Sequence, residues 1–408
     1  MSDRVKRKVP GIRFKGFEGE WERFQVNQIG EVITGNTPSK SDAKNYGGDI
    51  LWATAEDFSE KYIVNTKLKL TKQGASKARI LPQGSVLVTC IASIGKNAIA
   101  HNNMGTNQQI NGVIVNFSHN NEFFYHQISL NTNKLLLLAG VTAVPIVNKS
   151  TFECVEVLMP SLPEQIQIGN FFKLLDASLN QHQTKLEKLQ SLKQAMLQKM
   201  FPQGDARVPE IRFEGFEGEW EERELGEISK KITEKNLSRQ YKETFTNSAE
   251  FGVISQSQFF DKSISNVHNI GSYYIVEDND FVYNPRISSF APCGPINRNK
   301  LKRTGVISPL YTIFRTVGVD LGYLDYFFIT NLWHPYMYFN GDTGARSDRF
   351  SIKDSVFFSM PIICPPTKHE QQKIGTYFRK LDELIALERT QLDKLKQIKE
   401  ACLSGMFV

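Results

Sequence analysis

Two segments of the chain carry the same helical pattern of apolar residues, 206 positions apart. In residues 164–201 and again in residues 370–407, apolar side chains recur at alternating spacings of four and three, separated mostly by Leu, Lys, Gln and Glu, with no proline inside. This pattern predicts a long helix with one apolar stripe, and such a stripe needs a partner helix. We therefore predict that the two helices pair with each other, each about 55 Å long at 1.5 Å per residue.

The predicted seam between the helices contains ten positions, of which two are polar. These positions are Leu175, Leu179, His182, Leu186 and Leu189 in the first helix and Leu381, Ile385, Glu388, Leu392 and Leu395 in the second. His182 and Glu388 occupy equivalent positions, and in an antiparallel pair they fall in the same or adjacent layers, where polar residues can fix the register. Solvent exposure of both positions is the alternative. Antiparallel helices are expected because only they place two domains at opposite ends.

A second repeated block lies near the start of each domain. "VPGIRFKGFEGEW" at residues 9–21 and "VPEIRFEGFEGEW" at residues 208–220 are identical at eleven of thirteen positions. The chain therefore consists of two copies of one unit. Between the shared blocks, residues 22–160 and 221–365 show short strand patterns and turn residues but differ in sequence. A constant frame around different inserts suggests two adaptors with different binding specificities. Drift after duplication is the alternative, although drift should also have eroded the frame.

The length of 408 residues suits two domains. We predict a first domain at residues 1–162, a first helix at 163–201, a second domain at 202–365 and a second helix at 366–408. The fold class is α+β, with two mixed α/β domains joined by two long antiparallel helices and a pseudo-twofold internal repeat.

The composition favours a cytoplasmic protein with reduced thiols. No apolar run in the sequence approaches the length that spans a bilayer, and the charged N-terminus is not followed by the apolar stretch of a signal peptide. The five cysteines are scattered without metal-ligand or disulfide-framework spacing.

Charge is distributed in a way that points to nucleic acid. The net charge is only +6, but residues 61–121 contain seven basic residues and no acidic residue, and residues 281–319 contain six and none. Stretches of one sign suit a polyanion, and one such stretch in each insert favours DNA or RNA over ordinary solvated surface.

Side chains that suit DNA recognition lie on polar loops in or near these stretches. Paired amides can read adenine, and an arginine can read guanine or hold a phosphate with two hydrogen bonds. The candidates are Thr37, Ser39, Lys40, Lys96, Asn107, Gln108, Gln109, Asn284, Arg286, Arg298, Lys300, Arg303, Arg346 and Arg349.

The sequence contains no recognisable catalytic constellation. "IGKNA" at residues 94–98 lacks the spacing of a phosphate-binding loop, and "YNPR" at residues 283–286 departs from the methyltransferase motif that it approaches. The seven histidines lack metal-ligand spacing. We predict no catalytic, cofactor or metal site on this chain, and therefore a targeting protein.

Together these motifs resemble the specificity subunit of type I restriction-modification systems. The resemblance rests on the repeated "IRF-x-GFEGEW" block, "TPSK" at residues 37–40, "NQQ" at residues 107–109 and the proline followed by "EQ-x-x-IG" that begins each helix. It covers essentially the whole chain, with the order of domain and helix repeated twice. The second insert departs from it, because "NLSR" at residues 236–239 replaces the TPS loop.

The resemblance implies a host-defence protein without chemistry of its own. In that family each target recognition domain recognises one half of a bipartite, asymmetric DNA site, and the coiled coil sets the gap. Two modification subunits methylate adenine with S-adenosylmethionine, and two restriction subunits that use ATP with Mg²⁺ can join them. Neither cofactor is expected on this chain, and no membrane partner is expected.

Two other functions stay open at this point. A self-contained DNA-modifying enzyme would bind S-adenosylmethionine or cut DNA by itself. A non-catalytic coiled-coil scaffold would lack salt-dependent affinity for DNA.

Overall fold

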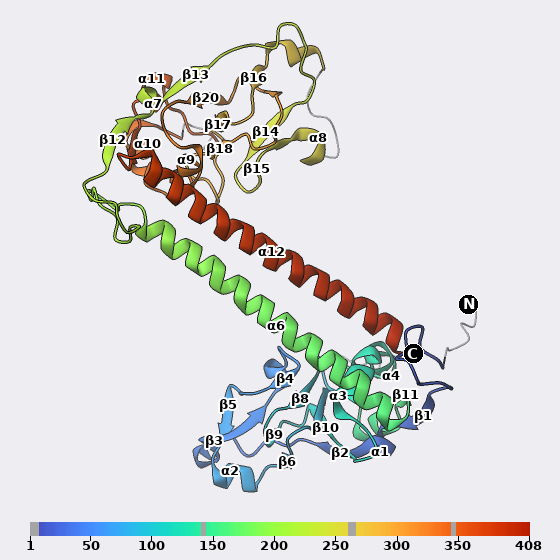
Figure 1. Cartoon of the computed structure of the whole chain (residues 1–408). Helices are drawn as coiled ribbons and strands as arrows, with labels where there is room; N and C mark the ends of the chain where they lie inside the picture. The colour runs from blue at the N-terminus through green and yellow to red at the C-terminus, as the bar shows by residue number, and fades with distance from the viewer. Residues whose placement is uncertain (1–7, 140–143, 260–266, 344–347) are drawn as a thin grey trace. The chain divides into compact units, whose positions relative to one another are not determined.

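Two long helices run through the structure, a computed structural model that describes residues 8–139, 144–259, 267–343 and 348–408 (Figure 1). Helix α6 spans Leu162–Lys199 and helix α12 spans Lys368–Met406. These bounds differ from the predicted ranges by one or two residues at each end, where helix ends commonly fray. No helix of the described ranges has the length and apolar character that crossing a bilayer would need.

The chain divides into two compact units. Unit 1 comprises Met1–Gln183 and Thr390–Val408, and unit 2 comprises Thr184–Arg389. The division falls inside both long helices, so each unit contains one mixed α/β domain together with part of α6 and part of α12.

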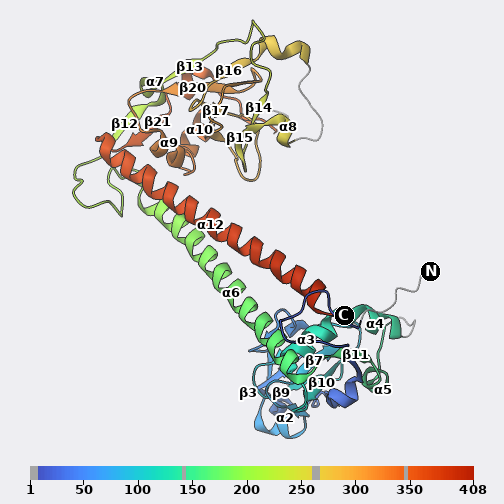
Figure 2. The ribbon, with the colours of Figure 1, turned by 45° about the vertical axis from the view of Figure 1, so that its right-hand side comes forward.

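Within unit 1 the two helices run antiparallel and lie side by side in both views (Figures 1 and 2). The ring of Phe172 lies 5.7 Å from that of Phe407, and Lys399 Nζ lies 2.7 Å from Asp176 Oδ1. Residue numbers therefore rise along α6 as they fall along α12. Two lysines surround the Asp176 carboxylate. Burial raises its pKa, but hydrogen bonds from Lys399 and Lys61 outweigh that effect, so the pKa lies below its ordinary value.

Within unit 2 the helices are antiparallel as well. Lys193 Nζ lies 2.5 Å from Asp382 Oδ1, and Lys185 pairs with the buried carboxylate of Glu388. Asp176 and Asp382 are equivalent, as are Lys399 and Lys193, because each pair is 206 positions apart. The repeat thus places the same ion pair between the helices in each unit, and the predicted antiparallel fold is confirmed.

The ten seam positions are all shielded from solvent to some extent. Leu175, Leu186, Leu381, Glu388 and Leu392 are buried, and Leu179, His182, Leu189, Ile385 and Leu395 are half-buried. His182 belongs to unit 1 and Glu388 to unit 2. An interaction between them remains a prediction.

Unit 1 contains two main sheets and a two-stranded pair formed by its first and last strands. Its strands and short helices are β1 Glu22–Gln25, α1 Val26–Ile29, β2 Gly30–Thr34, η1 Ala43–Asn45, β3 Tyr46–Ala53, η2 Ala55–Asp57, β4 Tyr62–Ile63, β5 Leu68–Leu70, α2 Lys72–Ser76, β6 Ile80–Leu81, β7 Val86–Thr89, β8 Asn97–Ala100, β9 Met104–Thr106, β10 Ile110–Val115, α3 Asn121–Leu130, α4 Thr132–Leu138, α5 Lys149–Glu153 and β11 Glu156–Met159. The sheet orders are β2-β10-β7-β8-β4 and β5-β3-β9-β6, and β1 pairs with β11.

Unit 2 is built from more and smaller sheets. Its elements are β12 Glu221–Glu224, α7 Leu225–Ile228, β13 Ser229–Ile232, β14 Phe245–Ser248, β15 Gly252–Ser255, α8 Gln256–Phe259, η3 Val267–Ser272, β16 Tyr274–Val276, β17 Phe281–Tyr283, β18 Ile296–Arg298, β19 Gly305–Ile307, β20 Thr312–Thr316, α9 Leu321–Phe327, α10 His334–Asn340, α11 Asp354–Phe358 and β21 Pro361–Cys364. The sheet orders are β13-β20-β17-β18, β14-β15, β16-β19 and β12-β21.

The two inserts share a core topology that their sequences do not reveal. The order β2-β10-β7-β8 in unit 1 corresponds to β13-β20-β17-β18 in unit 2, and the pair β1-β11 corresponds to β12-β21. All pairings within these shared sets are antiparallel. Strand positions, rather than residue identities, therefore define which loops of the two units are equivalent.

The repeated opening block acts as a clamp that holds the start of each long helix. The Arg13 guanidinium donates to both carboxylate oxygens of Glu164 at 2.8 and 2.7 Å and to the carbonyl of Gly19 at 2.6 Å. Arg212 makes the same three contacts with Glu370 and Gly218, at 2.7, 2.9 and 2.6 Å. Each arginine therefore fastens the start of a domain to the first turn of the long helix that follows that domain.

The block also closes each unit against the end of the other long helix. In unit 1 the amide of Ile12 donates to Gly405 O at 2.8 Å, and in unit 2 the amide of Ile211 donates to Lys199 O at 2.9 Å. Phe407 packs on Trp21 and Phe123, as Phe201 packs on Trp220 and Tyr323. In unit 2, residues 202–207 join the end of α6 to the opening block covalently. In unit 1, the end of α12 meets the opening block only through noncovalent contacts.

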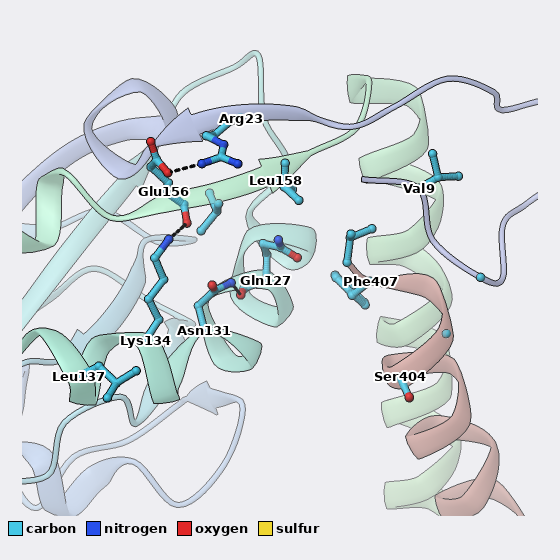
Figure 3. A pocket seen from close by; sticks show the side chains of 14 residues that line it. Val9, Arg23, Gln127, Asn131, Lys134, Leu137, Glu156, Leu158, Ser404 and Phe407 are labelled. Atoms are coloured by element: carbon cyan, nitrogen blue, oxygen red, sulfur yellow. Dashed lines mark hydrogen bonds and ion pairs between the residues drawn. The ribbon is translucent and has the colours of Figure 1, made fainter. Parts of the chain in front are cut away.

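Unit 1 has a pocket at the position that the connecting residues 202–207 occupy in unit 2. It measures about 620 Å³, and Figure 3 shows Gln127 and Asn131 on one side and Phe407 and Ser404 on the other. In unit 2, residues 204–207 line the equivalent position together with Phe327, and only about 210 Å³ remains open. The unit 1 pocket therefore has room for a connecting segment of the same kind.

We predict that a circular permutant keeps its fold. Joining Val408 to Met1 leaves nine residues between Phe407 and Val9, against six between Phe201 and Val208, and reopening the chain at Gly204 moves the break to unit 2. Because loop closure depends weakly on length, the free energy of unfolding should stay within about 1 kcal/mol of the parent value. Urea denaturation of parent and permutant measures this. A permutant that is unfolded with a longer linker as well would contradict the equivalence.

A lysine whose side chain is only 11% exposed fastens the unit 1 domain to α6. Lys61 Nζ lies 2.9 Å from both Glu122 Oε2 and Asp176 Oδ2, and Tyr62 donates to Glu122 at 2.5 Å. Burial and then the charge of Lys61 lower the pKa of the neighbouring His126 to about 3, so this imidazole is neutral near pH 7. The cluster orients the domain on the helix.

Candidate nucleic-acid interface

In unit 1 the predicted recognition loops emerge at one end of the five-stranded sheet. Thr34 at the end of β2 is opposite Asn111 in β10, and Thr89 at the end of β7 is opposite Ile110. The loops at residues 35–41, 90–96 and 107–109 therefore leave the sheet on the same side. All seven unit 1 candidates lie on these three loops.

The loop with Thr37 and the loop with Gln108 contact each other directly. Thr37 Oγ1 donates to Gln108 Oε1 at 2.6 Å. Asn107 and Gln109 exchange two hydrogen bonds of 3.0 Å and are half-buried, whereas Gln108 is exposed. Asn107 and Gln109 therefore hold the turn, and Gln108 presents its amide to solvent.

Basic residues flank this amide. Lys40 and Lys96 are exposed, and Ser39 is exposed with its hydroxyl 2.8 Å from that of Ser41. Arg79, which the sequence had not singled out, donates through Nη1 to Thr34 O at 2.7 Å and is also exposed. This end of the sheet thus combines one exposed amide with three cationic side chains.

In unit 2 three candidates lie at the equivalent end of the sheet. Tyr283 at the end of β17 is opposite Thr312 in β20, so the following residues occupy the position of the unit 1 loops. Asn284 supports the loop, because its amide donates to Asn247 O at 2.8 Å and its Oδ1 accepts from the Arg286 amide at 3.0 Å. Arg286 and Arg349 pair in an isolated antiparallel bridge, and both are exposed.

Three further candidates of unit 2 lie away from this end and are ion-paired. Arg298 donates to both oxygens of Asp325 at 3.1 and 2.6 Å, and Lys300 lies 2.9 Å from the same carboxylate. Arg303 donates to both oxygens of Glu243 at 2.7 Å. The acids come from outside the basic stretch, so a stretch of one sign in sequence is partly neutralised in space. Arg346 lies outside the described residues.

The structure identifies three exposed apolar side chains that were not among the candidates from the sequence. Leu237, Phe290 and Leu310 are 79%, 77% and 58% exposed and lie on tight turns at the same end of the unit 2 sheet as Arg286. We call these three residues the apolar tips. The turn at residues 308–311 precedes β20 as residues 107–109 precede β10, so Leu310 is the counterpart of the Gln108 loop. Only this topological equivalence identifies it.

The described ranges contain no group of three or more His, Cys, Asp or Glu side chains arranged to hold a metal ion. The arrangement at both sheet ends is suited to contact a polyanion and to present hydrogen-bonding and apolar groups to base edges.

Substitutions at these ends should separate two kinds of contact. Gln108→Ala is expected to relax preference at particular base pairs by about 1–3 kcal/mol, whereas Lys96→Ala should weaken binding to all duplexes and flatten the salt dependence. Competition titrations with single-base-pair variants at several salt concentrations measure both effects. Arg303→Ala is the matched control, because Glu243 holds the Arg303 guanidinium. This substitution should alter neither the base-pair preference nor the salt dependence. Equal loss on all duplexes for Gln108→Ala and Lys96→Ala would contradict the assignment.

The chain is similar in sequence to one family model and to two curated proteins with related descriptions. The family model described as type I restriction modification DNA specificity domain matches residues 18–191 and 217–397. The specificity subunit of type I restriction enzyme MjaIX from Methanocaldococcus jannaschii is 28% identical over 233 residues, which are 52% of this chain and 52% of that protein. The specificity subunit of the HindI enzyme from Haemophilus influenzae is 33% identical over 147 residues, 35% of this chain and 32% of that protein.

A solved structure shares the fold over nearly the whole length. The S subunit of a type I restriction-modification system from M. genitalium superposes with a TM-score of 0.61 at 13% identity, covering 98% of this chain and 99% of that one. The two curated relatives are matched over only about half and a third of their lengths.

Proposed function

Because the chain belongs to the type I restriction modification DNA specificity family, we propose that it supplies the DNA sequence specificity of a type I restriction-modification complex. The observation that carries the proposal is the pair of equivalent sheet ends. Both units keep the same strand order but present different loop chemistry, an exposed amide with lysines in unit 1 and arginines with apolar tips in unit 2. One scaffold with two different reading surfaces suits a target with two different halves.

Each unit would recognise one half of a bipartite, asymmetric site. The chain itself would perform no chemistry, in keeping with a targeting subunit. Two modification subunits would methylate adenine with S-adenosylmethionine, and restriction subunits that use ATP with Mg²⁺ would join them. Those cofactors would bind to the partner subunits, since the sequence has neither a glycine-rich nucleotide loop nor a complete methyltransferase motif.

Exchange of one insert tests this proposal. Residues 22–160 would be replaced by the corresponding insert of a relative, and methylated adenines would be mapped in a host that carries the chain and its modification subunit. One half of the methylated sequence should change while the other half stays the same. The reciprocal exchange of residues 221–365 is the control and should change the other half. A change in both halves, or methylation that ignores the exchange, would sink the proposal.

A further inference from the structure

The apolar tips combine three features that ordinary surface residues lack. Each is a large apolar side chain, each is more than half exposed, and all three leave the unit 2 sheet at the end that carries Arg286 and Arg349. Scattered exposed apolar residues need no explanation, but a group at a candidate interface indicates a contact surface.

Each tip is held on a rigid turn. Leu237 follows Asn236, which is fully buried and whose side chain both donates to Tyr241 O at 2.7 Å and accepts from the Tyr241 amide at 3.2 Å. The amides of Ala291 and Tyr311 close the turns that carry Phe290 and Leu310, each with a 3.1 Å bond to the serine carbonyl three residues earlier. The tips are therefore fixed before any partner binds, which limits the entropy lost on binding.

Strand pairing sets the spacing and direction of the segments that precede two of the tips. Lys235 pairs with Tyr274, and Tyr274 pairs with Ile307, both antiparallel, so the segments that lead to Leu237 and Leu310 run in the same direction. Two strand spacings, or about 10 Å, separate Lys235 from Ile307.

Among the described residues of unit 1, Val144 and Ile146 lie beside the loop at residues 90–96 of the equivalent end, and each is less than half exposed. The loop in the position of residues 308–311 carries the exposed amide of Gln108, and the loop after β2 carries Ser39 and Lys40. The two loops that precede β10 and β20 therefore differ in chemistry, with an exposed amide in unit 1 and an exposed aliphatic side chain in unit 2.

We propose that Leu237 and Leu310, together with Phe290 on the loop that follows β17, read thymine methyl groups in the major groove of the half-site recognised by unit 2. The C5-methyl of thymine is the apolar group that distinguishes A·T and T·A pairs in that groove, and an aliphatic side chain is its natural contact. Arg286 and Arg349 lie at the same end of the sheet and supply the cationic contact that positions the tips on the duplex. This inference rests on the proposed function and adds the feature by which one half-site is recognised.

Replacing thymine by deoxyuridine tests the inference with the unmodified protein. The chain, assembled with its modification subunit, would first select bound duplexes from a random pool made with thymine and from one made with deoxyuridine. The half-site assigned to unit 2 should contain thymine, and its preference should be lost in the deoxyuridine pool. Single replacements in the selected duplex should weaken binding about fourfold per methyl, as expected for one buried methyl-sized group. Replacements in the other half should have no such effect.

Variants connect the methyl effect to particular tips. Leu310→Ala and Leu237→Ala should each lose sensitivity to one deoxyuridine position, and Val317→Ala is the matched control. Val317 is 60% exposed but follows β20 at the opposite end of the sheet, so its replacement should leave all sensitivities intact. Selective binding without a methyl effect in the unmodified protein, or a Leu310→Ala variant that binds thymine and deoxyuridine duplexes with equally reduced affinity, would overturn the inference alone. Absence of any sequence-selective binding would instead overturn the proposed function.

Discussion

Replacing Arg13 by alanine is expected to lower the free energy of unfolding of unit 1 by about 3–5 kcal/mol, because it leaves a buried carboxylate without its partner. Glu164 is 1% exposed and accepts two hydrogen bonds from Arg13. Water cannot replace these bonds without opening the junction between domain and helix. Urea denaturation, read out by hydrogen exchange of unit 1 peptides, measures the change.

The control for this prediction is Arg23, an arginine of the neighbouring strand β1. Arg23 pairs with Glu156, but both side chains are about half exposed, so Arg23→Ala should cost less than about 1 kcal/mol. Arg212→Ala should reproduce the large effect in unit 2, since Glu370 is equally buried. A small loss for both Arg13→Ala and Arg212→Ala would show that the clamp does not stabilise the units.

Replacing Phe407 by alanine is expected to destabilise unit 1 by about 3–5 kcal/mol through the cavity it leaves. The ring is 7% exposed and packs on Phe123 at 5.1 Å, on Phe172 at 5.7 Å and on Trp21 at 6.2 Å. It joins α12 to the domain of unit 1 without a covalent link. Thermal unfolding followed by near-ultraviolet circular dichroism measures the loss.

A second phenylalanine separates this effect from loss of any aromatic residue. Phe117 is 95% exposed, so Phe117→Ala should leave the melting temperature unchanged within about 1 °C. If Phe407→Ala were as harmless as Phe117→Ala, the noncovalent closure of unit 1 would not contribute to its stability.

Local sequence patterns were sufficient for the helices and the repeat. The spacing of Leu175, Leu186, Leu381 and Leu392 predicted a shared seam, and all four are buried. Helical periodicity depends on neighbours three and four residues apart, so the sequence alone displays it. The duplicated opening block was equally visible, although its role was not, because Arg13 meets Glu164 across 151 positions.

The charge stretches show where sequence reasoning reached its limit. Arg298 and Arg303 stand in a stretch without acids, yet Asp325 and Glu243, 27 and 60 positions away, pair with them. A count along the chain includes only sequence neighbours, whereas electrostatic neutralisation depends on neighbours in space.

Tertiary contacts also determine which residues form the candidate recognition surface. The sequence by itself determined that two different inserts lie in one repeated frame, because the opening block and the long helix each occur twice with similar residues. Only the tertiary structure decided that Gln108 faces solvent while Asn107 and Gln109 hold its turn, and that Leu310 occupies the equivalent place in unit 2. Strand register across the sheet fixes these positions, and register is set by pairing between segments that are far apart in the chain.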